Sequence, residues 1–97
     1  MKFKLFAKFP FIVKSNTLCF TCCHILNENK RVRYVSHDND GDWQFLCGEK
    51  HSPADARIVS LSEIITLDKN VVELSDLECG EYAEEKDEKW IIYKRNS

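Results

Sequence analysis

The chain has 97 residues, of which 43% are hydrophobic and 31% charged, and its formal net charge is −2. This length indicates one domain, and the composition excludes a disordered chain. Residues 1–33 hold seven Lys or Arg and one acid, whereas residues 34–97 hold seven Lys or Arg and fifteen acids. The basic residues gather toward an amino end that we expect to fray, and not in a stripe on a folded face. We therefore expect no nucleic-acid binding.

The first 17 residues differ in composition from the rest of the chain. Lys8, Pro10 and Lys14 interrupt their apolar run, which is unlike a signal peptide and far shorter than the ~20 apolar residues of a membrane span. We expect residues 1–17 to form an N-terminal extension, either a loose leader or an added edge strand, and residues 18–97 to form the single domain. Five cysteines, two of them adjacent, favour reduced thiols and a cytoplasmic location over a disulfide framework.

Three strands are predicted in the first half of the domain. Residues 17–26, TLCFTCCHIL, are rich in β-formers on both faces, as in a central strand. Residues 31–36, RVRYVS, alternate between polar and apolar side chains and predict a half-buried strand. After the turn HDNDGD, residues 43–47, WQFLC, resume the alternation. Short connections between these strands predict an antiparallel meander.

The second half adds short helices and a closing hairpin. Residues 57–61 predict a short strand, and Ser60 with Glu63 has capping-box spacing for a helix that follows. Residues 70–77 predict one more helical turn. The segments EYAEE and KWIIYK flank the turn KDE and predict a hairpin. The fold class is therefore α+β, with a single antiparallel sheet, made of the meander and the C-terminal hairpin, and one or two short helices.

Cysteine and histidine spacing raises the possibility of a metal site. Cys19 and Cys22 form a CxxC pair, and Cys47 and His51 form a second pair, with 24 residues between Cys22 and Cys47. Zinc takes four tetrahedral nitrogen or sulfur ligands, which these two pairs would supply. Against this, Cys19 and Cys22 would point to opposite faces of a strand. The alternative is that the cysteines are small buried apolar side chains.

Two further kinds of site receive less support from the sequence. No local pattern orients a histidine toward a cysteine, so we expect no nucleophilic or redox centre and no enzymatic activity. Asp38, Asp40, Asp42 and Glu49 match ligand positions of an EF-hand loop, but Trp43 stands where that loop requires glycine. A turn with left-handed geometry at Asn39 or Gly41 accounts for these residues without calcium.

Acidic residues gather in the carboxyl half and form a candidate surface for a basic protein partner. The alternative is a solvated face that keeps the protein soluble. The candidate partner-binding residues are Asp38, Asp40, Asp42, Glu78, Glu81, Glu84 and Glu85.

The stretches DGDWQFLCG and ARIVSLSEI, with a leucine-rich segment that ends at Gly80, resemble a group of small uncharacterised bacterial proteins. More distantly, they resemble the immunity-protein-like domains of unknown function in polymorphic toxin systems. This resemblance covers roughly residues 19–90 as a motif match. It implies a non-enzymatic protein that binds and blocks a partner protein, and it assigns no catalytic residue or cofactor. We therefore expect a non-enzymatic binding module. The alternative is a small zinc protein that uses Cys19, Cys22, Cys47 and His51.

Overall fold

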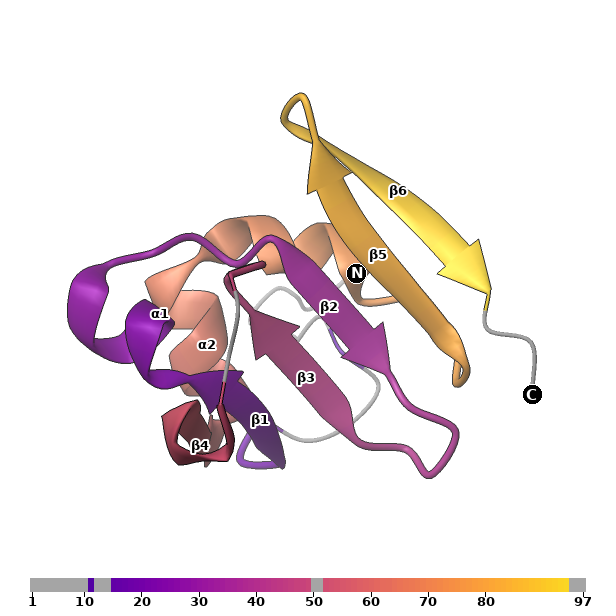
Figure 1. The fold of residues 1–97 in the computed structure, drawn as a ribbon. Helices are drawn as coiled ribbons and strands as arrows, with labels where there is room; N and C mark the ends of the chain where they lie inside the picture. The colour runs from indigo at the N-terminus through magenta and orange to yellow at the C-terminus, as the bar shows by residue number, and fades with distance from the viewer. Residues whose placement is uncertain (1–10, 12–14, 50–51, 95–97) are drawn as a thin grey trace, which may run out of the picture.

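The computed structural model describes residues 11, 15–49 and 52–94 (Figure 1). It contains one six-stranded sheet in the order β4-β1-β3-β2-β5-β6. The strands are β1 (Leu18–Cys22), β2 (Tyr34–His37), β3 (Trp43–Leu46), β4 (Ala56–Ser60), β5 (Glu81–Lys86) and β6 (Lys89–Lys94). The helices are α1 (Cys23–Glu28) and α2 (Leu61–Leu67), with 3-10 turns η1 (Pro53–Asp55) and η2 (Lys69–Leu74). The α+β class is confirmed.

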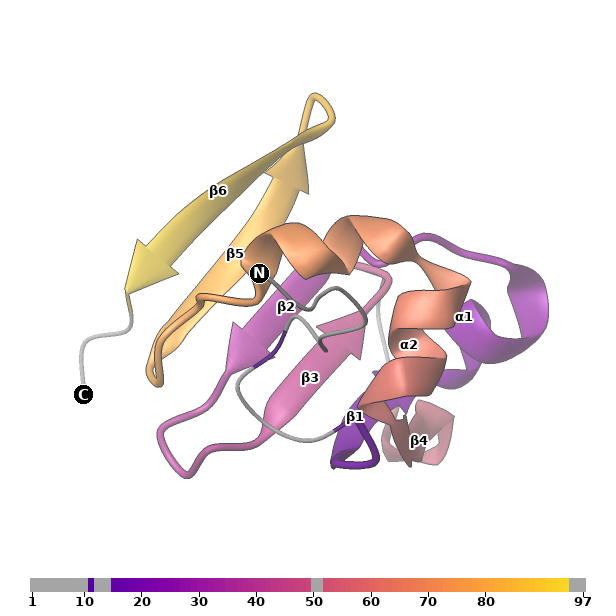
Figure 2. The same cartoon turned by 180° about the vertical axis from the view of Figure 1, so that it is seen from behind.

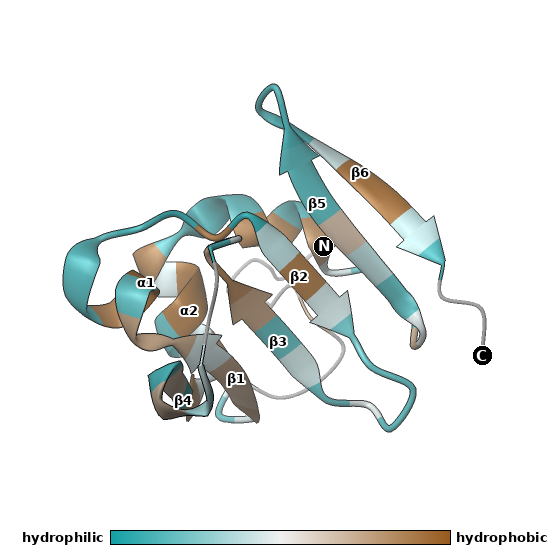
Figure 3. Cartoon of the chain, in the orientation of Figure 1, coloured by the Kyte–Doolittle hydropathy of each residue, from teal (hydrophilic) through white to brown (hydrophobic). Residues whose placement is uncertain are grey.

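Two hairpins lie where the sequence predicts them. Strands β2 and β3 pair antiparallel around the turn after His37, in which the Asp38 amide donates to the Asp42 carbonyl at 2.8 Å. Gly41 has a φ of +95°, as the turn requires. Strands β5 and β6 form the closing hairpin, in which Asp87 and Glu88 adopt positive φ. The turns are hydrophilic in Figure 3, as expected for connections that face water.

The sheet differs from the predicted meander at its first strand, because β1 pairs with β3 in parallel and does not pair with β2. The predicted strand over residues 17–26 ends at Cys22, where α1 begins. This helix buries Ile25 and ends at Asn29, which has the left-handed conformation typical of a helix end. A helix between strands lets the chain cross over and return in the same direction. The sheet is therefore mixed, although mostly antiparallel.

Strand β4 completes the sheet at its other edge and leads directly into α2. It pairs antiparallel with β1. Ser60 caps α2, because its side-chain oxygen accepts a hydrogen bond from the Glu63 amide at 3.3 Å. The predicted helical turn over residues 70–77 corresponds to η2, which Asp68 caps through the Asn70 amide. The local capping signals of the sequence thus agree with the structure.

In the described part of the chain, helices cover one face of the sheet and leave the other uncovered. Helix α2 and η2 lie across the sheet in the view from behind (Figure 2), whereas no helix crosses β2, β3 and β5 in the view of Figure 1. Apolar side chains pack between the sheet and these helices. The buried apolar residues are Phe11, Cys19, Cys22, Ile25, Val32, Val35, Trp43, Phe45, Cys47, Leu61, Ile64, Val71, Leu74, Leu77 and Ala83.

Part of the predicted N-terminal extension is described and contacts the domain. Phe11 is buried and packs edge-on against Trp43, with ring centroids 5.0 Å apart. The carbonyl groups of Ser15 and Thr17 accept hydrogen bonds from the first turn of α2, at 3.0 and 2.9 Å. Residues 1–10 and 12–14 of the extension lie outside the described residues.

Candidate functional site

A cluster of cysteine and histidine side chains forms where β1 passes into α1. Cys22 is the last residue of β1, His24 lies in the first turn of α1, and Cys47 follows β3 directly. Parallel pairing places Phe20 opposite Gln44, so the carboxyl ends of β1 and β3 meet at one end of the sheet. This register brings together thiols that are separated by 25 positions in sequence.

The side-chain atoms of this cluster are close to one another. The sulfur atoms of Cys22 and Cys47 and a ring nitrogen of His24 all lie within 4.8 Å of one another. The Cys47 Sγ is 3.6 Å from the His24 Nδ1. Both cysteines are buried, while His24 is half-buried. We call these three residues the Cys22–His24–Cys47 cluster.

A second group shares His24 with this cluster. Cys23, His24 and Asp55 also place ligand atoms within 4.8 Å of one another. The Cys23 thiol lies 3.6 Å from the Asp55 Oδ1. The other Asp55 oxygen accepts a hydrogen bond from the Ser52 amide at 2.9 Å, which closes the capping box of η1. The Asp55 carboxylate therefore already has a local structural role.

The thiols of Cys47 and Cys23 have raised pKa values. Burial raises the pKa of the Cys47 thiol and its contact with Cys22 adds to this, while a backbone hydrogen bond from Glu49 opposes it. Burial and the neighbouring Asp55 carboxylate raise the pKa of Cys23. The Arg57 guanidinium lowers the pKa of Cys23 but does not outweigh burial and Asp55, so both thiols are protonated at neutral pH. This protonation does not favour a nucleophilic thiolate.

The structure brings together two of the four predicted metal ligands, Cys22 and Cys47. Cys19 is buried on the other face of β1, as its odd separation from Cys22 requires. His51 lies outside the described residues. His24 and Asp55 were not among the predicted ligands. The signal for His24 was its spacing of two residues from Cys22, and no sequence signal pointed to Asp55.

Another cysteine–histidine contact lies at the opposite end of the sheet. The Nδ1 of His37 is 2.7 Å from the Leu77 carbonyl oxygen, so this nitrogen carries the proton. The Nε2 of His37 lies 3.6 Å from the Cys79 sulfur, and its ring stacks on Trp43 with centroids 4.0 Å apart. These contacts fix the start of β5 against β2. No third metal-ligating side chain joins this pair among the described residues.

The face of the sheet without helices carries exposed apolar and aromatic side chains. One register row crosses all six strands and contains Ile58, Phe20, Gln44, Ser36, Tyr82 and Tyr93. Leu18 lies on the same face, two residues before Phe20. Tyr34, Tyr82 and Tyr93 form a ladder whose successive ring centroids are 5.8 and 5.1 Å apart. We call this set, with Leu46 and Glu84, the uncovered face.

Leu18 and Ile58 are the most exposed large apolar residues among those described. Leu18 has 66% of its surface exposed, Ile58 has 61%, and Phe20 has 37%. All three lie at the β1–β4 end of the uncovered face. A monomeric protein rarely exposes a contiguous apolar patch without a use for it in binding.

The predicted acidic residues near the β2–β3 turn border the uncovered face. Asp38 accepts hydrogen bonds from the Ser36 hydroxyl at 2.5 Å and from the Gln44 side-chain amide at 2.7 Å. Asp40 accepts one from the Asp42 amide at 3.1 Å, within the exposed turn. Asp38 therefore fixes the turn, whereas Asp40 and Asp42 keep most of their carboxylate surface toward water.

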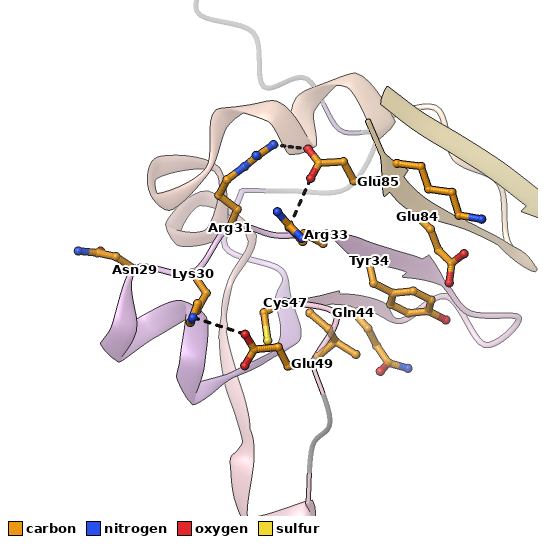
Figure 4. A pocket seen from close by; sticks show the side chains of 13 residues that line it. Asn29, Lys30, Arg31, Arg33, Tyr34, Gln44, Cys47, Glu49, Glu84 and Glu85 are labelled. Atoms are coloured by element: carbon orange, nitrogen blue, oxygen red, sulfur yellow. Dashed lines mark hydrogen bonds and ion pairs between the residues drawn. The ribbon is translucent and has the colours of Figure 1, made fainter. Parts of the chain in front are cut away.

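The acidic residues of β5 divide between two environments. Glu84 lies opposite Tyr34 on the uncovered face, in the hollow of Figure 4. Glu85 points to the other face and pairs with Arg31 and with Arg33, whose Nε lies 3.5 Å from the Glu85 carboxylate. Only 9% of the Glu85 side chain is exposed. The structure thus places Glu84 where a partner can reach it, whereas Glu85 is itself buried and pairs with two exposed arginines.

Glu78 and Glu81 lie where the chain enters β5. The Glu81 carboxylate accepts a hydrogen bond from the Glu78 amide at 2.9 Å, so it closes the turn before the strand. Glu81 pairs with His37 in the strand register. Because Glu81 is four residues before Glu85, it lies on the same face of β5 as Glu85 and not on the uncovered face with Glu84.

Comparisons with protein-family models, with curated proteins and with solved structures give no match. None of the helices in the described residues combines the length and the apolar character that crossing a membrane requires. The functional inferences below therefore rest on the side chains and their geometry.

Proposed function

We propose that the protein is a non-enzymatic binding module that recognises a basic surface on a partner protein through its uncovered face. The observation that carries this proposal is the set of exposed apolar and aromatic side chains on one continuous face of the sheet, with Leu18 and Ile58 more than 60% exposed. Protein interfaces are enriched in tyrosine and other aromatic residues. The tyrosine ladder supplies such side chains on a rigid strand scaffold.

Charge supports a basic partner. Among the described residues, the acids that form ion pairs are Glu49, with Lys30 at 3.4 Å, and Glu85, with its two arginines. Three of the four cations that line the hollow in Figure 4, Lys30, Arg31 and Arg33, therefore have an acidic partner within the molecule. Asp40, Asp42 and Glu84 have no such lysine or arginine partner in the described part of the chain. Unpaired rim carboxylates attract a basic protein and raise its association rate.

The resemblance to immunity-protein-like domains agrees with this proposal, because such proteins act by binding and blocking a partner. A toxin with a basic surface is one partner of the required chemistry. Under this proposal the apolar side chains of the uncovered face would supply most of the affinity, while the acidic rim would supply steering and selectivity.

The test compares matched surface variants of the full chain. Leu18→Ser and Ile58→Ser alter the uncovered face, whereas Leu67→Ser and Ile92→Ser alter side chains that are 46% and 55% exposed elsewhere. Each immobilised variant is incubated with a bacterial lysate, and bound proteins are quantified by mass spectrometry. We expect a basic protein that the wild type and both control variants capture and that the two uncovered-face variants lose.

The captured protein is then purified and its affinity is measured directly. Ile58→Ser should weaken binding by about tenfold or more, the size expected for an interface residue that contributes over about 1.4 kcal/mol. Glu84→Gln should lower the association rate and its dependence on salt. A partner that both control variants lose, and that the uncovered-face variants retain, would overturn the proposal. So would a partner whose binding is indifferent to Glu84 and to salt.

A further inference from the structure

The Cys22–His24–Cys47 cluster borders the uncovered face, because Cys22 lies on the same side of β1 as Phe20, but it points to a different chemistry. Its three side chains come from the end of β1, the first turn of α1 and the residue after β3. Parallel pairing of β1 and β3 holds the two cysteines at the same end of the sheet. Cys22 and His24 therefore stand on regular elements, which position side chains more rigidly than loops do, and Cys47 directly follows one.

The observed spacing fits a tetrahedral zinc ion. Zinc lies about 2.3 Å from a cysteine sulfur and about 2.0–2.1 Å from a histidine nitrogen. Tetrahedral angles then place a sulfur and a nitrogen ligand about 3.5–3.6 Å apart, and two sulfur ligands about 3.8 Å apart. The Cys47 sulfur and the His24 Nδ1 are 3.6 Å apart, and all three ligand atoms lie within 4.8 Å of one another. These distances are compatible with one ion bound by all three atoms.

From this geometry we infer that Cys22, His24 and Cys47 bind one zinc ion. Two thiolates and an imidazole suit a borderline-soft cation such as zinc, and they suit magnesium or calcium poorly because those ions prefer oxygen. The ion would neutralise the negative charge of two buried thiolates. The three side chains leave one position of the tetrahedron for water or another donor.

The neighbouring Cys23 and Asp55 are not assigned to this ion. The Asp55 carboxylate already caps η1 through the Ser52 amide and contacts the Cys23 thiol. Cys23 and Asp55 are also more exposed than Cys22 and Cys47. Their substitution therefore serves as a test of which of the two groups around His24 holds the metal.

The zinc ion would join three segments that otherwise meet only through backbone pairing and packing. It would fix the start of α1 against the end of β3, beside the single parallel strand pair. Binding to the folded chain alone would raise its stability with the concentration of free metal.

The experiment measures metal binding by the full chain without an affinity tag. The protein is depleted of metal with a chelator and titrated with Zn²⁺ and, separately, with Co²⁺, whose absorption bands report thiolate ligands and tetrahedral geometry. We expect one ion per chain and cobalt bands typical of two thiolate ligands. Loss of an outer-shell partner alone lowers metal affinity about 10–100-fold, so Cys47→Ser and His24→Ala should lower it more.

Three control variants keep the assignment falsifiable. Cys19→Ala removes a buried cysteine outside the cluster, Cys79→Ser removes an exposed one, and Asp55→Asn alters the second group. All three should retain one zinc ion per chain and the cobalt spectrum of the wild type. His24→Ala changes a half-buried helix residue, and its far-UV circular dichroism verifies that it folds.

Two results would overturn the inference. The first is a folded wild-type chain that binds neither Zn²⁺ nor Co²⁺ stoichiometrically, which would make the 3.6 Å contact a thiol–imidazole hydrogen bond in a packed core. The second is binding that Cys47→Ser leaves intact and Asp55→Asn abolishes, which would assign the ion to the second group.

Discussion

Replacing Glu85 by glutamine removes the shared acidic partner of two arginines while keeping the shape of the side chain. Glu85 pairs with Arg31 and Arg33, which both lie in the connection between α1 and β2. Its backbone amide also donates to the Arg33 carbonyl at 3.0 Å. The carboxylate thus fastens this connection to β5, and we expect the substitution to lower stability without affecting partner binding.

The expected cost follows from the exposure of the three side chains. Hydrogen bonds to charged groups contribute about 1.5–3 kcal/mol when sheltered, whereas exposed ion pairs contribute about 1 kcal/mol or less. Glu85 is 9% exposed, but the arginine side chains are 47% and 60% exposed and stay largely hydrated. We therefore expect Glu85→Gln to lower the free energy of unfolding by about 1–2 kcal/mol. For a domain of this size, each kcal/mol lowers the Tm by about 4–8 °C.

Urea unfolding at low and high salt measures this cost, with Glu84→Gln as the matched control. Glu84 is the preceding residue and forms no ion pair in the described chain, so its substitution should change stability by less than about 0.5 kcal/mol. The Glu85→Gln cost should shrink at high salt because the arginines are accessible to ions. Equal stability of the two variants, or a loss of partner binding specific to Glu85→Gln, would refute this reasoning.

Three further substitutions test the packing of the sheet. Thr21→Val removes a buried hydrogen bond from the hydroxyl to the Phe45 carbonyl at 2.7 Å and should cost about 1–3 kcal/mol in urea unfolding; a neutral result would contradict that bond. Gly80→Ala forces a side chain onto a residue with φ of +89° and should cost about 1–3 kcal/mol, measured the same way. Burial, with the Glu63 carboxylate adding to it, raises the pKa of Cys19 to about 12. Because the unfolded thiol ionises near pH 8.5, this group stabilises the fold fully below that pH and loses its contribution as pH rises toward 12. The stability difference between wild type and Cys19→Ala should therefore fall by up to about 1.4 kcal/mol per pH unit in that range, and a constant difference would contradict the raised pKa.

Local sequence signals predict the hairpins and helix caps of this fold. The Ser60 cap depends on residues three positions apart, and the β5–β6 hairpin depends on a short charged turn between two strands, so neighbouring residues suffice to reveal them. The predicted first strand extends beyond Cys22, where β1 ends, because the residues after Cys22 are also β-formers that would suit both faces of a sheet. These residues form helix α1 instead, which is stabilised by the burial of Ile25 and ends at Asn29 in the left-handed conformation.

The parallel pairing and the cluster that it creates depend on contacts between distant residues. Spacing alone indicated Cys22 and Cys47 as ligands, but it did not reveal that β1 and β3 run in the same direction. That direction decides which ends of the strands meet, and it brings His24 to Cys47. The environments of the acidic residues also depend on strand pairing. The register places Glu84 on the accessible face of β5, whereas the next residue, Glu85, faces the other way and forms ion pairs.

The central claim, that a partner binds the uncovered face, is tested most directly by side-chain NMR of the full chain with its captured partner. Methyl signals report apolar contacts at single residues on both faces. The proposal predicts that partner addition shifts the methyl signals of Leu18 and Ile58 and the ring signals of Tyr82, while those of Leu67 and Ile92 stay unchanged. Shifts confined to Leu67 and Ile92 would contradict the proposal and place the partner on the other side of the sheet.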